Sequence, residues 1–202
     1  MTVPNSGKGP LREEDLLIER FKEGDRASFD KIYSKYKARI LSYINRMIGN
    51  IAVAEELTQE TFINVFINVA RYEPRGMFKA WIYMIASNLA KNELRRRSQR
   101  KDVSLFKVIG GQSCDTTLEN VLTSESLSPE SIINNGELKE TIEEILQSLP
   151  VIHREVLVLC VIEGLSYEEA ARVLNINVKT VSSRLVRARR RFIEDIKRRR
   201  GK

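Results

Sequence analysis

The stretch from Leu165 to Phe192 constrains the fold more than any other part of this 202-residue chain. Ser166, followed three residues later by a glutamate, makes a capping box, which predicts that a short helix begins at Tyr167. The three residues from Asn175 to Asn177 leave room only for a turn, and Asn177 can cap a second helix through its side-chain oxygen. Apolar residues then recur at spacings of three and four and form one stripe: Val181, Leu185, Ala188 and Phe192. The pattern predicts two helices joined by a tight turn.

The opposite face of the second helix carries basic and hydroxyl side chains, namely Lys179, Thr180, Ser183, Arg187 and Arg190. Lys and Arg can reach guanine acceptors in the major groove of DNA, and Ser or Thr can reach base edges or phosphates. The alternative is a helical hairpin whose basic face is merely solvated. Cap, turn length, apolar stripe and charge all agree with DNA recognition, so we interpret the stretch as a helix-turn-helix.

The distribution of charge indicates more than its total. A net charge of +7 and a pI of about 9.5 suggest a polyanionic partner, but do not separate DNA from RNA or an acidic membrane surface. Residues 91–101 and 179–202 are strongly basic, whereas residues 102–150 are mostly acidic. Two basic segments on either side of an acidic one predict two contacts with nucleic acid.

Several classes of function have no support in the sequence. Two cysteines far apart and a single histidine make neither a disulfide framework nor a metal-ligand cluster. Glycine-rich phosphate loops and hydrolase motifs are absent from the sequence, and no segment approaches eighteen apolar residues. We therefore predict no enzyme, no catalytic residue, no metal and no cofactor, and we expect a cytoplasmic protein that is not inserted directly in a membrane.

Helical periodicity continues through most of the chain, and no strand pattern of any length appears. The expected fold is all-α, with two helical domains joined by a flexible linker. The expected boundaries are a disordered tail at 1–10, a first domain at 11–99, a linker at 100–135 and a second domain at 136–202. Within the first domain, helices are predicted at about 11–23, 25–49, 51–70 and 77–99.

The helix that begins near Phe78 is the second informative stretch. Its predicted buried stripe is Phe78, Trp81, Ile82, Ile85 and Leu89. The ridge through Trp81 and Ile85 becomes polar at Asn88 and Asn92, next to a run of basic residues. Amides beside an aromatic ring and arginines suit unstacked bases of single-stranded DNA. The alternative is that the amides cap local groups and the arginines form a solvated run, but the second basic segment favours the DNA interpretation.

The preceding helix, 51–70, is apolar nearly all round. Ile63 and Ile67 lie on a face shared with Glu56 and Glu60, away from the main apolar stripe. Such isoleucines either contact a partner protein or are buried by another helix of the same domain, and the sequence leaves both open.

The histidine and the two cysteines carry no catalytic signal. His153 has no acid, serine or cysteine at a useful spacing, so we expect a surface or half-buried histidine. Cys160 lies in an apolar run and is interpreted as a small core residue, and Cys114 lies in the predicted linker.

Three segments together resemble one protein family: AEELTQETF, FKAWIYMIASNLAKNELRRR and SLPVIHREVLVLCVIEGLSYEEAARVLNINVKTVSSRLVRARRRF. They resemble regions 2.2, 2.3–2.4 and 4 of the bacterial sigma-70 family, in its extracytoplasmic-function (group 4) class. The resemblance covers about Glu13 to Arg100 and Glu137 to Lys197 and implies a sigma factor, which binds core RNA polymerase and directs promoter-specific initiation.

The resemblance also implies roles for individual residues. Core polymerase, through its β′ clamp helices, would contact Glu56, Gln59, Glu60, Ile63 and Asn64. The −10 element would be melted and read, with a flipped base trapped, by Tyr72, Phe78, Asn88, Lys91, Asn92 and Arg95. The −35 duplex would be read by Lys179, Thr180, Ser183, Arg184 and Arg187.

Partners and alternatives complete the expectation. The second domain would also touch the flap of the polymerase β subunit, and an anti-sigma factor would hold the protein inactive. One alternative is a stand-alone helix-turn-helix regulator that binds duplex DNA without polymerase. Another is a helical adaptor that binds an acidic protein through its basic tail.

Overall fold

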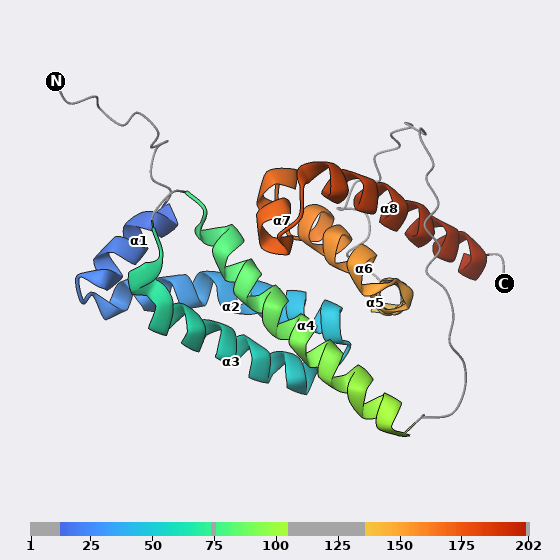
Figure 1. Cartoon of the computed structure of the whole chain (residues 1–202), viewed down its shortest axis with the longest axis horizontal. Coiled ribbons are helices and arrows are strands. Elements are labelled where there is room, and N and C mark those ends of the chain that lie inside the picture. Colours follow the sequence, from blue (N-terminus) through green and yellow to red (C-terminus); the bar gives the residue numbers. More distant parts are fainter. Residues whose placement is uncertain (1–12, 74–75, 105–135, 201–202) are drawn as a thin grey trace.

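The computed structural model describes residues 13–73, 76–104 and 136–200, and all regular elements within these ranges are helical, as predicted. Figure 1 shows two groups of helices, which we call the first unit (α1–α4) and the second unit (α5–α8). The first unit contains α1 (Glu13–Lys22), α2 (Arg26–Ile48), α3 (Ile51–Asn68), the 3-10 turn η1 (Val69–Arg71) and α4 (Phe78–Ser104). The second unit contains α5 (Gly136–Ser148), α6 (Val151–Leu157), the π-helical turn η3 (Val158–Ile162), α7 (Tyr167–Leu174) and α8 (Val178–Arg200). The predicted tail and most of the predicted linker, with Cys114, lie outside the described residues.

Side-chain caps set the ends of the first helices where the sequence predicted them. Asp25 Oδ1 accepts a hydrogen bond from the backbone N–H of Ala27 at 3.0 Å, and α2 begins at the next residue. Asn50 Oδ1 accepts from the N–H of Val53 at 3.1 Å and caps α3. Gly49 ends α2 in the left-handed region, with φ of 69°, where a glycine carries no steric penalty. Local sequence chemistry therefore decides these boundaries.

Helix α2 is the centre of the first unit, because it packs against α1, α3 and α4. Its fully buried side chains follow helical spacing: Ile32, Tyr36, Ile40, Tyr43, Ile44 and Met47. Tyr36 meets Phe78 of α4 edge to face, with ring centroids 5.6 Å apart. Each such buried side chain contributes about 1.5–3 kcal/mol relative to exposure, so this core holds α4 firmly in place.

The second unit packs α8 across α6 and α7. The chain departs from α-helical spacing at η3, where the N–H of Glu163 donates to the carbonyl of Val158 five residues earlier, at 2.9 Å. Periodicity alone did not predict this π-turn, since the apolar run there reads equally well as ordinary α-helix. A π-helical turn holds one residue more than an α-helical turn, so the side chains that follow it face in a different direction. Glu163 is one of the side chains that face the first unit, where its carboxylate accepts from the Tyr83 hydroxyl.

Helix α4 lies between α3 and the second unit, which explains a wrong prediction about its buried face (Figure 1). Phe78 and Ile82 are buried as expected, whereas Trp81, Ile85 and Leu89 are only half-buried. The residues that are buried instead include Ala80, Tyr83, Ala86, Ser87 and Ala90. Because the second unit covers a side of α4 that the sequence pattern assigned to solvent, the buried stripe is rotated. The helix also continues to Ser104, past its expected end at Gln99.

Candidate nucleic-acid interface

The helix-turn-helix is built by the predicted caps. Ser166 Oγ accepts from the N–H of Glu169 at 3.1 Å, and the Glu169 carboxylate accepts from the N–H of Ser166 at 2.9 Å. Asn175 ends α7 in the left-handed region with φ of 53°. Asn177 Oδ1 then accepts from the N–H of Thr180 at 2.7 Å and begins α8. Asn175, which ends α7, and Asn177, which caps α8, bound a three-residue turn and set the direction of the second helix relative to the first.

The apolar stripe of α8 is buried and its basic face is exposed. Val181, Leu185 and Ala188 are buried against α6 and α7. The exposed side chains of the opposite face are Lys179, Ser183, Arg187 and Arg190. Two of the predicted DNA contacts are less free than the others, because Thr180 and Arg184 are half-buried. The Thr180 hydroxyl also donates to Asn177 Oδ1 at 2.8 Å, which places it in the cap.

His153 lies beneath this basic face, and the expectation of a surface or half-buried histidine was wrong. The side chain is only 6% exposed, because α6 packs against α8. Burial lowers the pKa of His153 below its usual value, and the positive charges of Arg191 and Arg187 lower it further. A hydrogen bond with the backbone of Arg184 opposes the shift without reversing it. The imidazole of His153 is therefore neutral where it packs beneath α8.

A pH dependence of stability follows from this position. The pKa of His153 is lower in the folded chain than in the unfolded chain, where it is about 6.5. As pH falls below about 6.5, the unfolded state takes up a proton that the folded state resists, so the free energy of unfolding decreases. We expect urea unfolding at pH 5.5 and 7.5 to show a smaller pH dependence for His153→Gln than for the native chain. Equal pH dependence of the two proteins would contradict this account of His153.

Cys160 is half-buried and packs against the core, as interpreted from the sequence. Burial raises the pKa of its thiol to about 11. The thiol therefore remains protonated and unreactive at neutral pH.

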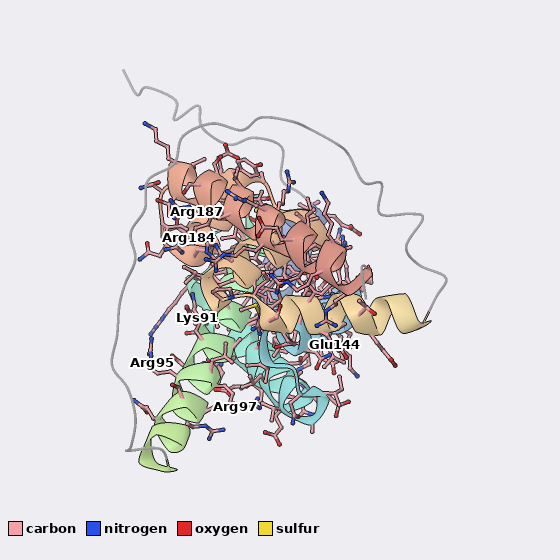
Figure 2. All side chains as sticks on the ribbon, turned by 90° about the vertical axis from the view of Figure 1, so that its right-hand side faces the viewer. Lys91, Arg95, Arg97, Glu144, Arg184 and Arg187 are labelled. Carbon is pink, nitrogen blue, oxygen red and sulfur yellow. The ribbon has the colours of Figure 1, made fainter. Side chains whose placement is uncertain are left out.

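A second basic group lies on α4. Figure 2 shows Lys91 and Arg95 on this helix, and Arg184 and Arg187 on α8 of the second unit. Asn88, Asn92 and Arg95 are exposed. Lys91 is half-buried, and its Nζ atom lies 3.4 Å from a carboxylate oxygen of Glu155 in the second unit. Three of the four predicted contacts on this face are therefore open to solvent, and the fourth is engaged by an acid.

An open cleft of about 370 Å³ lies between α3 and α4, beside this group. It is lined by Asn64, Asn68, Arg71, Trp81, Ile85, Asn88 and Leu89. The cleft combines an aromatic ring and aliphatic side chains with amides and one guanidinium, which is the chemistry that a single unstacked base requires. Asn64 and Asn88 were predicted to belong to different sites, and the fold brings them together. Asn68 and Arg71 were not predicted as site residues, and their only signal in the sequence was their position near the end of the predicted helix at 51–70.

Tyr72 and Phe78 are buried rather than exposed on this face. Tyr72 stacks on Trp81, with ring centroids 4.8 Å apart, and Phe78 packs edge to face on Tyr72 at 5.7 Å. The Tyr72 hydroxyl donates to Asp15 Oδ1 at 2.8 Å, and the N–H of Gly76 donates to Asp15 Oδ2 at 2.5 Å. Asp15, a buried acid on α1 that was not predicted as a site residue, thus holds both Tyr72, after η1, and Gly76, before α4. Tyr72 and Phe78 therefore pack behind the ring of Trp81, which lines the cleft.

Four of the five predicted polymerase-contacting residues share the outer face of α3, whereas the fifth, Asn64, is half-buried and lines the cleft. Ile63 and Ile67 are 56% and 69% exposed, which excludes their burial by another helix of the first unit. Glu56, Gln59 and Glu60 are exposed beside them. Exposed isoleucines rimmed by acids and amides form an apolar patch with a polar border, as at protein interfaces.

Two models of one family match the chain: Sigma-70 region 2 over residues 32–100 and Sigma-70 region 4 over residues 139–192. The chain is 33% identical over 172 residues to the ECF RNA polymerase sigma factor SigW of Bacillus subtilis, covering 85% of this chain and 90% of that protein. This chain is an ECF sigma factor of the sigma-70 family. It is also 34% identical over 184 residues to the RNA polymerase sigma-H factor of Pseudomonas aeruginosa, covering 88% of this chain and 90% of that one.

Membership in the family settles the general function. The sigma factor directs transcription initiation by RNA polymerase, and it is not an enzyme. Every helix among the described residues is either too short or too polar to span a lipid bilayer.

Two solved structures share the fold of this sigma factor. CnrH in complex with the cytosolic domain of CnrY has a TM-score of 0.64 at 22% identity, covering 91% of this chain and 97% of that chain. The sigma factor RpoE of Bartonella quintana in complex with the anti-sigma factor NepR also has a TM-score of 0.64 at 22% identity, covering 84% and 96%. At this level of identity the likeness supports the fold alone.

Proposed function

We propose that this sigma factor divides promoter recognition between two domains, residues 11–99 for the −10 element and residues 136–202 for the −35 element, with 100–135 as the linker. The observation that carries the proposal is the presence of two separately built basic faces. One lies on a capped helix-turn-helix, and the other lies on α4 beside a cleft of a size and chemistry suited to one base. Duplex and single-stranded DNA need these two different kinds of surface.

The −35 duplex is read by α8 in the major groove. Lys179, Ser183 and Arg187 are exposed on one face and would supply the base contacts. Thr180 and Arg184, which are half-buried, would hold the backbone at the edge of the groove. The basic residues beyond Arg187 add sequence-independent attraction that weakens with salt.

The −10 strand is captured along α4. Asn88 lines the cleft between α3 and α4, where a flipped base would stack near Trp81. Asn92 would read a neighbouring base, and Lys91 and Arg95 would hold the strand backbone. Tyr72 and Phe78 contribute by fixing the ring of Trp81, since both are buried against it.

Core polymerase binds the outer face of α3. The β′ clamp helices would cover Ile63 and the exposed side chains around it, Glu56, Gln59 and Glu60. They would reach Asn64 only at the edge of this face, where it meets the cleft. The second unit would touch the β flap. This face of α3 is apolar at its centre and acidic at its border, whereas the two proposed DNA faces are basic.

Replacing Ile63 with glutamate is expected to abolish stable association with core polymerase while leaving the fold intact. The side chain is 56% exposed, so the substitution disturbs little internal packing, but it places a charge at the centre of an apolar contact. Gel filtration with purified core enzyme measures the association. Leu16→Glu, at an exposed apolar residue on α1, is the matched control. If both variants lose association with core polymerase to the same extent, or if neither loses it, the assignment of the α3 face to core polymerase is wrong.

We also propose that this sigma factor acts in the cytoplasm and that an anti-sigma factor controls it. One solved relative is described as a complex with an anti-sigma factor, and another as a complex with a cytosolic domain. An inhibitor that holds this chain would act where polymerase acts, in the cytoplasm.

The direct test is gel filtration of the native protein with core RNA polymerase. We expect co-elution. Tight binding to duplex DNA alone, with no association with core, would favour a stand-alone helix-turn-helix regulator. Activity that survives removal of the basic face of α8 would instead favour a helical adaptor.

A further inference from the structure

Helix α1 holds Tyr72 at two points. The Asp15 carboxylate accepts from the Tyr72 hydroxyl at 2.8 Å, and Lys22 Nζ donates to the backbone carbonyl of Tyr72. Asp15 and Lys22 are almost two helical turns apart on α1, so they lie on one face of the helix. Ile18 lies between them and is fully buried in the first unit. One helix therefore fixes both the side chain and the backbone of Tyr72.

Asp15 also bonds to the residue that leads into α4. Its second oxygen, Oδ2, accepts from the backbone N–H of Gly76 at 2.5 Å, shortly before α4 begins at Phe78. The Asp15 side chain is fully buried, and a buried carboxylate is strongly destabilising unless its oxygens accept hydrogen bonds. An apolar side chain could fill this place at a lower cost of desolvation. What the carboxylate adds is direction, because its two bonds set the end of η1 relative to the start of α4.

The ring of Tyr72 contacts Trp81, which lines the cleft between α3 and α4. The two rings stack with 30° between their planes and 4.8 Å between their centroids. Phe78 packs against both rings, at 5.7 Å from Tyr72 and 5.8 Å from Trp81. A ring that is already held in place loses less side-chain entropy when a ligand binds to it. The position of Tyr72 thus determines how ready Trp81 is to receive a base.

We propose that Asp15 and Lys22 are positioning residues for capture of the −10 strand. By holding Tyr72, they keep the ring of Trp81 where the cleft receives an unpaired base. Among the described residues, those that line the cleft do not include Asp15 or Lys22, so both act through Tyr72. Helix α1 therefore contributes to promoter opening, and not to the contacts that we assign to α8 and to the outer face of α3. The inference rests on the proposed assignment of the cleft to the −10 strand.

The same helix offers a matched control. Glu14, the neighbour of Asp15, accepts from the hydroxyl of Tyr36 at 3.0 Å, and Tyr36 is also buried. Tyr36 lies on α2, and the described lining of the cleft does not include it. Tyr36→Phe and Tyr72→Phe each remove one phenol hydroxyl from an acid of α1 and keep the aromatic ring. A purely structural role predicts the same effect for both variants, whereas a positioning role predicts an effect at the cleft for Tyr72→Phe alone.

Fluorescence of Trp81, the only tryptophan of the chain, tests the positioning without polymerase or DNA. In the free protein, Tyr72→Phe and Asp15→Ala should shift the emission to longer wavelength and raise the acrylamide quenching constant. Lys22→Met, which keeps the aliphatic stem and removes the donor, should change both in the same direction. Tyr36→Phe should leave both at the native values. Circular dichroism checks that each variant keeps its helices.

Asp15→Asn is the conservative variant that should rescue the loss. The amide oxygen can still accept from the N–H of Gly76, and the amide nitrogen can donate to the Tyr72 hydroxyl. We therefore expect emission and quenching of Trp81 close to the native values for Asp15→Asn, in contrast to Asp15→Ala.

Reactivity of −10 thymines to permanganate, measured with the holoenzyme, tests strand capture. Tyr72→Phe should lower this reactivity about threefold relative to Tyr36→Phe, which is the effect expected from the loss of one buried hydrogen bond. DNase protection of the −35 element and co-elution with core polymerase should remain at the native level in both variants.

Two results would overturn the inference. If emission and quenching of Trp81 are the same in Tyr72→Phe and Tyr36→Phe, α1 does not hold the ring. If only the fluorescence differs and permanganate reactivity does not, the position of the ring does not serve strand capture. Asn88→Ala distinguishes these failures from failure of the proposed function. If Asn88→Ala lowers permanganate reactivity, only the role of α1 is wrong, and if it does not, the assignment of the cleft to the −10 strand is wrong as well.

Discussion

Arg187→Ala is expected to weaken recognition of the −35 element by about 5- to 150-fold, because one well-placed contact to a base edge contributes about 1–3 kcal/mol. Arg187 is exposed on the face of α8 opposite the buried stripe, so its removal leaves the packing of the helix intact. The measurement is DNase footprinting of the holoenzyme on a promoter that the native holoenzyme transcribes. In the variant, protection of the −35 element from DNase should be lost, while the helical content of the protein remains unchanged.

Arg198→Ala is the control for Arg187. Arg198 is an exposed arginine of the same helix that pairs with Asp195, far from the turn. Its loss should reduce binding to all DNA sequences to a similar extent and should lower the salt dependence. If the two variants weaken binding in the same sequence-independent way, α8 does not read the −35 element through Arg187.

Asn88→Ala is expected to impair promoter opening with duplex binding intact. Its exposed amide lines the cleft between α3 and α4, so the substitution removes a contact that only an unpaired base can make. Unstacking a base costs about a few kcal/mol, and this must be recovered by capture of that base. Reactivity of −10 thymines to permanganate, which reports single-stranded DNA, should fall by about tenfold or more while upstream protection persists.

Gln99→Ala, at an exposed amide further along α4, is the control for Asn88 and should leave permanganate reactivity at the native level. The comparison with Arg187→Ala decides whether the two units act at separate steps. If Asn88→Ala and Arg187→Ala both fail at duplex binding, the proposed division between them is wrong.

The caps and the helix-turn-helix could be predicted from the sequence because they depend on neighbouring residues. Asp25, Asn50 and Ser166 each satisfy backbone groups within four residues of themselves. A side-chain oxygen, a short turn and an apolar stripe are local signals, and the structure places all three where they were expected.

Features that depend on packing between the two units could not be predicted in this way. The true buried face of α4 includes Tyr83 and Ser87, whose partners lie about 70 to 80 residues later in the chain. His153 is buried because α8 crosses α6, a contact that no local spacing reveals. The cleft between α3 and α4 likewise needs two helices at a specific distance before Asn64 and Asn88 belong to one site.

Transcription in vitro from a genomic promoter library, with purified core polymerase and this protein as the only sigma factor, tests the central claim most directly. The account predicts transcripts whose start sites share two sequence elements at a fixed spacing. One element should be altered in its base preference by Arg187→Ala, and the other by Asn88→Ala. Start sites with a single shared element, or none above the level of core polymerase alone, would contradict the account.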